Sequence, residues 1–125
     1  MGTRAGIIAL ATDGRWGRVY CGHDGYPSGA GAELDKHYND QAKIDALIAL
    51  GDSSGIGPEL TDVDAYRKRG ETDIEPRYYD SLEAALAEDE MGEEYVYAWT
   101  GKRWLGGRPC ADEADLLPVE EMGGD

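Results

Sequence analysis

The chain has 125 residues, of which 26 are acidic and 12 are basic, and its net charge is −14. A chain of this length fits one domain, so we expect residues 1–125 to share a single hydrophobic core. Such an acidic surface repels nucleic acid and anionic membranes, and no apolar run approaches the roughly 18 residues of a membrane span, so we expect a cytoplasmic protein.

Two apolar runs at the N-terminus surround Asp13-Gly14. Asp-Gly between strand-like runs is a strong signal for a hairpin turn. The pattern therefore predicts strands near residues 4–11 and 15–22. Since side chains alternate along a strand, Cys21 should point into the core.

The next segment has helical spacing of its apolar residues. We expect a first helix over residues 30–38, and a second that begins at Asn39 or Asp40 as N-cap and stops at Gly51. Residues 51–60 are rich in turn formers and predict a loop. The ambiguous stretch that follows is expected to include one extended segment ending near Tyr79.

The C-terminal half begins with a well-marked helix signal. Asp80 is the expected N-cap, Glu83 lies three residues later as in a capping box, and Gly92 is a C-terminal stop. A second hairpin should follow within "EEYVYAWTGKRWLGG", and the tail is expected to fray from about residue 112.

These elements predict an α+β fold. The N-terminal and C-terminal hairpins should build an antiparallel sheet, with about three helices packed on one of its faces. No internal repeat or long linker divides the chain.

The stretch "CGHDGYP" brings together residue types that can react or bind metal. Cys21, His23 and Asp24 would need a fourth ligand such as His37 or Cys110, and the spacing matches no paired zinc motif. With two cysteines the chain has too few for a disulfide scaffold, so both should be free thiols. We interpret the stretch as a turn leading into a helix, and predict no cofactor, no metal and no catalysis.

Charge is unevenly distributed. Residues 1–60 hold 8 acidic and 5 basic residues, a net of −3, whereas residues 61–125 hold 18 and 7, a net of −11. Residues 80–94 contain seven carboxylates and no base, and residues 112–125 contain six and no base. Such carboxylates can approximate the spacing of DNA phosphates, roughly 7 Å along a strand.

The candidate partner-binding residues are the carboxylates of these two stretches. They are Asp80, Glu83, Glu88, Asp89, Glu90, Glu93, Glu94, Asp112, Glu113 and Asp115. Paired bonds from arginine to carboxylate are strong, so the expected partner presents Lys and Arg. Tyr95 or Trp99 could serve as an aromatic anchor at the rim.

The N-terminal half resembles a group of small bacteriophage and prophage proteins in which a strand ends in a Cys-His-Trp-Asp-Gly-Tyr-Pro pattern, followed by a Gly and a helix that closes with His-Tyr. The resemblance rests on "TRAGIIALATDGRWGRVYC", "DGYPSGAG" and "HYNDQAKIDALIALGD". The positions that fit the pattern are Asp24, Gly25, Tyr26, Pro27, Gly31, His37 and Tyr38. Gly22 and His23 stand where the pattern has His and Trp.

The resemblance implies phage origin, and small acidic phage proteins often act against host defence. By analogy with acidic anti-CRISPR proteins that mimic DNA, the expected function is to block a nucleic-acid-binding complex of the bacterial host, such as a CRISPR effector, from within its cytoplasm. The alternative is a module that binds a small molecule, such as a defence nucleotide, at the "HDGYPSGAG" turn, where exposed backbone N–H groups precede a helix.

Overall fold

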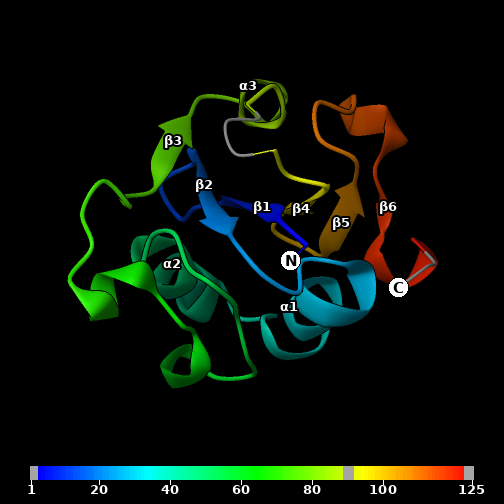
Figure 1. The fold of residues 1–125 in the computed structure, drawn as a ribbon. Coiled ribbons are helices and arrows are strands. Elements are labelled where there is room, and N and C mark those ends of the chain that lie inside the picture. The colour runs from blue at the N-terminus through cyan, green and yellow to red at the C-terminus, as the bar shows by residue number, and fades with distance from the viewer. Residues whose placement is uncertain (1–2, 89–91, 123–125) are drawn as a thin grey trace.

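One six-stranded sheet organises the protein (Figure 1). A computed structural model describes residues 3–88 and 92–122. The strand order is β3-β2-β1-β4-β5-β6. The strands are β1 (Ala5–Leu10), β2 (Trp16–Cys21), β3 (Arg77–Tyr79), β4 (Tyr95–Trp99), β5 (Trp104–Gly107) and β6 (Leu117–Pro118). Both predicted hairpins form, as β1–β2 and β4–β5.

The sheet is mixed, which corrects the expectation of an antiparallel one. Its two central strands, β1 and β4, are paired in parallel, with Ala5 opposite Tyr95 and Ala9 opposite Trp99. Parallel neighbours require a long crossover connection. Here the connection comprises all residues between β1 and β4. Because the two strands are so far apart along the chain, no local sequence pattern in either hairpin specifies their relative direction.

Helices cover both faces of the sheet rather than one. They are α1 (Ala32–His37), α2 (Gln41–Ala49) and α3 (Leu82–Leu86). Side chains of α1 and α2 pack with Ile7 and Tyr97 in one core cluster, while α3 packs with Ile8 and Val96 in a second. Because neighbouring residues on a strand face opposite ways, central strands that are apolar throughout require cover on both sides. The α+β class is confirmed.

Residues 112–122 pack on the fold, although the tail was expected to fray from about residue 112. Strand β6 pairs with β5, placing Leu117 opposite Gly106. Val119 lies in the first core cluster. The burial of this side chain holds the segment against the sheet, so the described part of the tail belongs to the fold.

The segment after α2 extends the sheet without forming a full strand. Ser53 makes a parallel bridge to Cys21 and an antiparallel bridge to Ala65. The buried Asp52 carboxylate accepts a hydrogen bond from the Tyr20 N–H at 2.9 Å. These contacts fix residues 52–66 beside the end of β2.

Candidate functional site

Helix α3 lies near the start of the first acidic stretch. It begins one residue later than predicted and ends at Leu86, well before the predicted stop at Gly92. The Ser81 hydroxyl, not the Asp80 carboxylate, accepts a hydrogen bond from the Ala84 N–H, at 3.1 Å. Ser81 is therefore the N-cap. Leu82 and Leu86 face the sheet, and this leaves Asp80 and Glu83 exposed to solvent.

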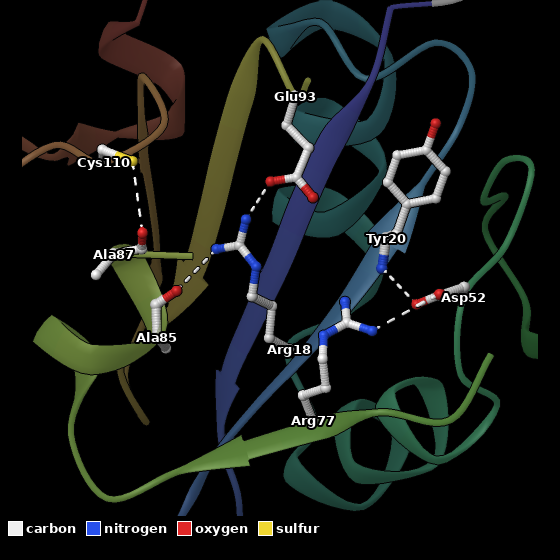
Figure 2. A network of polar contacts seen from close by, with 8 residues as sticks. All are labelled: Arg18, Tyr20, Asp52, Arg77, Ala85, Ala87, Glu93 and Cys110. Carbon is white, nitrogen blue, oxygen red and sulfur yellow. Dashed lines mark hydrogen bonds and ion pairs between the residues drawn. The ribbon is translucent and has the colours of Figure 1, made fainter. Parts of the chain in front are cut away.

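The second acidic stretch lies beside α3. Leu116, which follows the helical turn η4 (Glu113–Asp115), is buried in the same cluster as Leu82 and Leu86. The Cys110 thiol also donates to the Ala87 carbonyl at 3.6 Å (Figure 2). Two stretches separated along the chain thus meet on one side of the sheet.

We call the exposed carboxylates of these neighbouring segments the acidic surface. It comprises Asp80, Glu83, Asp112, Glu113 and Asp115. Among the other candidates, Glu94 is exposed just before β4 and Glu88 is half-buried. Asp89 and Glu90 lie outside the described residues.

Glu93 is not a surface carboxylate, so its inclusion among the partner-binding residues was wrong. Its side chain is 2% exposed and forms an ion pair with Arg18 of β2, itself 1% exposed (Figure 2). A buried charge must be paired to be tolerated. The Glu93 side chain therefore lies in the interior, where its ion pair with Arg18 holds the residues before β4 against the sheet.

Arg18 links three elements and was missed as an important residue. Its Nη1 donates to the Ala85 carbonyl of α3 at 2.9 Å, while Nη2 contacts Glu93. The side chain crosses β1 at Gly6, where a Cβ would lie 2.7 Å from Nη2. The available signal was a charged residue in the middle of a strand that is otherwise apolar on both faces.

The two proposed aromatic anchors have different positions. Trp99 is 4% exposed and donates through its indole N–H to the Gln41 side chain at 2.9 Å, so it belongs to the core. Tyr95 is half-buried and lines a groove of about 490 Å³ together with Asp115 and the exposed Leu117. Only Tyr95 can therefore contact a partner near the acidic surface.

The "CGHDGYP" stretch forms the turn that its residues predict. Cys21 is fully buried, and burial raises the pKa of its thiol to about 11, so the reactive thiolate is scarce at neutral pH. The His23 ring contacts the Ser54 hydroxyl at 2.8 Å through Nδ1. Across residues 3–88 and 92–122, no three His, Cys, Asp or Glu side chains lie close enough together to hold a metal ion.

A cavity of about 300 Å³ adjoins this turn. Its lining includes Tyr26, Ile56 and the carboxylates of Asp24 and Glu33. One Glu33 oxygen is buried and has no hydrogen-bond partner. Two carboxylates repel an anion, so the lining of this cavity opposes a nucleotide.

Comparisons with known proteins returned no match to a family model, to a curated protein or to a solved structure. Within the described part of the chain, no helix has the length and apolar character needed to cross a membrane.

Proposed function

We propose that the protein is a non-enzymatic anti-defence protein of a phage or mobile element. It blocks a nucleic-acid-binding complex of the host, of the CRISPR-effector kind, by presenting its acidic surface in place of DNA. The observation that supports this proposal is the packing of α3 beside η4, because it brings carboxylates of two acidic stretches to neighbouring positions where Lys and Arg of a partner can pair with them.

The buried pair beneath this surface also supports the proposal. Arg18 holds both Glu93 and the carbonyl of Ala85, and so it fixes α3 relative to β4. A DNA mimic gains affinity when its charges are held in place before binding, since less side-chain and backbone freedom is then lost.

The alternative, a small-molecule module at the "HDGYPSGAG" turn, has a cavity in its favour. The Asp24 and Glu33 carboxylates oppose the defence nucleotide that the sequence suggested. We therefore propose the acidic surface, and not this turn, as the functional site.

Charge reversal provides the test. The variant Glu83→Lys/Glu113→Lys changes both halves of the acidic surface and reduces the net charge from −14 to −10. We expect it to lose binding to a DNA-binding complex captured from the host, and to stop competing with duplex DNA for that complex. The measurement is a competition assay with labelled DNA at increasing concentrations of each variant.

The matched control is Glu71→Lys/Glu75→Lys, which also has a net charge of −10. These residues are exposed in the loop before β3, away from α3 (Figure 1). Their ion pairs with Arg69 and Arg67 are at the surface, where such pairs contribute little stability. Equal loss of competition in both variants would show an effect of net charge alone and contradict the proposal, as would full competition by Glu83→Lys/Glu113→Lys.

A further inference from the structure

A second cavity, of about 620 Å³, lies at the end of the sheet where β2 finishes. Its lining includes Arg4, Tyr20, Gly22, His23, Tyr66 and Glu94. Cavities of roughly 300–1,000 Å³ are typical of small-molecule sites. Both cavities are lined by hydrogen-bond donors, but this one includes the guanidinium of Arg4 and one carboxylate, Glu94, whereas the cavity at the turn includes the two carboxylates of Asp24 and Glu33.

The sheet topology brings these residues together. Ala5 is opposite Cys21 of β2 and Tyr95 of β4, so the residues next to these three positions meet where the three strands end, on the same side of the sheet's ladder. The Glu94 N–H accordingly donates to the Arg4 carbonyl at 2.8 Å. Tyr66 is placed there from the other side, because Ser53 bridges both β2 and Ala65.

Two phenol groups converge on the space above Gly22. The Tyr66 hydroxyl oxygen lies 2.7 Å, and that of Tyr20 lies 3.6 Å, from the point that a Cβ of Gly22 would occupy. Any larger residue at position 22 would therefore fill the gap between the two hydroxyls.

Neither of these hydroxyls has a hydrogen-bond partner among the described residues, although Tyr20 is only 8% exposed. Its hydroxyl points away from the Asp52–Arg77 pair (Figure 2). Burial raises the pKa of both phenols, so both are protonated donors at neutral pH. Each phenol O–H lines the cavity and is therefore placed to donate a hydrogen bond to a ligand oxygen.

We propose that this cavity binds a small molecule through a phosphate group, whose oxygens accept hydrogen bonds from Tyr20 and Tyr66. Arg4 supplies positive charge at the same cavity, opposite in sign to the lining carboxylate Glu94, and His23 lines it as a further polar group. A phosphate offers several acceptor oxygens to donors that come from different elements, and the volume leaves room for the rest of the molecule. The −14 net charge opposes the ligand weakly, since distant surface charges are screened beyond about 8 Å at physiological salt.

The test is an NMR titration of the full chain with three probes: adenosine 5′-monophosphate, inorganic phosphate and adenosine. We expect the monophosphate to shift the backbone amides of Gly22 and His23 and to bind more tightly than adenosine. Binding of inorganic phosphate at the same amides would identify the phosphate itself as the recognised group. Failure of both phosphate-bearing probes to shift these amides would overturn the proposal.

Three variants locate the site. Tyr66→Phe keeps the ring but removes one donor, and should weaken binding of the monophosphate about tenfold, as expected for one hydrogen bond to a charged group. Gly22→Ala should abolish binding by filling the gap, and Tyr78→Phe, at the exposed edge of β3, should leave it unchanged. Equal affinity in Tyr66→Phe, Tyr78→Phe and the unaltered protein would contradict the proposal even if Gly22→Ala failed to fold.

Discussion

At the scale of single residues, the fold tolerates the buried charge of Arg18 because the neighbouring groups leave space for it, accept its hydrogen bonds and neutralise it. Gly6 leaves room for the guanidinium, Ala85 accepts one hydrogen bond and Glu93 provides the opposite charge. Removing both charges together can be neutral, whereas removing one leaves the other uncompensated. Substitution of either Arg18 or Glu93 alone should therefore destabilise the fold.

We predict that Glu93→Gln lowers the free energy of unfolding by about 3 to 5 kcal/mol, because it leaves the buried Arg18 charge without its partner. The neighbouring change Glu94→Gln affects an exposed side chain and should stay within about 0.5 kcal/mol of the original protein. Urea denaturation followed by circular dichroism compares the two. Similar effects of both changes would contradict the buried role of Glu93.

Residue-scale inference from the sequence succeeded where a local rule applied. Alternation along β2 placed Cys21 in the core correctly. The same rule could not separate Glu93 from Glu94, because both precede β4 and only the position of Arg18 on another strand decides which one is buried.

At the scale of elements, helix α3 is short and its start matters to the acidic surface. The five-residue helix has few hydrogen bonds of its own, and isolated helices of this length are unstable. The Ser81 cap and the burial of Leu82 and Leu86 therefore maintain it.

We predict that Ser81→Ala destabilises the protein by about 1 kcal/mol, since it removes the acceptor for the Ala84 N–H. Asp80→Ala should change the free energy of unfolding by less than about 0.5 kcal/mol, because Asp80 is exposed and does not cap the helix. Thermal unfolding of the two variants measures the difference. A larger effect from Asp80→Ala would restore the assignment made from the sequence.

The sequence predicted most elements because turns and caps depend on adjacent residues. The Asp13-Gly14 turn, the Asp40 cap of α2 and the left-handed Gly51 that follows it all have local causes. The error of one residue at the start of α3 arose because Asp80 and Ser81 are both good caps, and the choice depends on how Leu82 meets the sheet. The end was also wrong, since the helix stops at Leu86 and not at Gly92.

At the scale of the whole molecule, the excess of carboxylates makes the folded state repel itself. Arg18–Glu93 is the buried ion pair of the described residues, while the other pairs retain at least one partly or fully exposed partner. Surface pairs of this kind stabilise little. Long-range repulsion among like charges is therefore only partly offset.

We predict that the melting temperature rises by a few degrees between about 20 mM and 500 mM sodium chloride, because salt screens this repulsion. The variant Glu71→Lys/Glu75→Lys, with net charge −10 instead of −14, should show a smaller rise. Differential scanning calorimetry at each salt concentration measures both. A melting temperature that falls with salt would contradict the prediction.

The sequence by itself determined the α+β class, both hairpins, the presence of the three α-helices and the buried thiol, because each follows from residues close together along the chain. Only the tertiary structure decided that β1 and β4 run parallel, that helices cover both faces, and that Glu93 is internal while α3 and η4 lie side by side. These features depend on packing between residues distant along the chain, and many pairings satisfy the same local pattern. The acidic stretches were therefore visible in the sequence, but their joining into one surface was not.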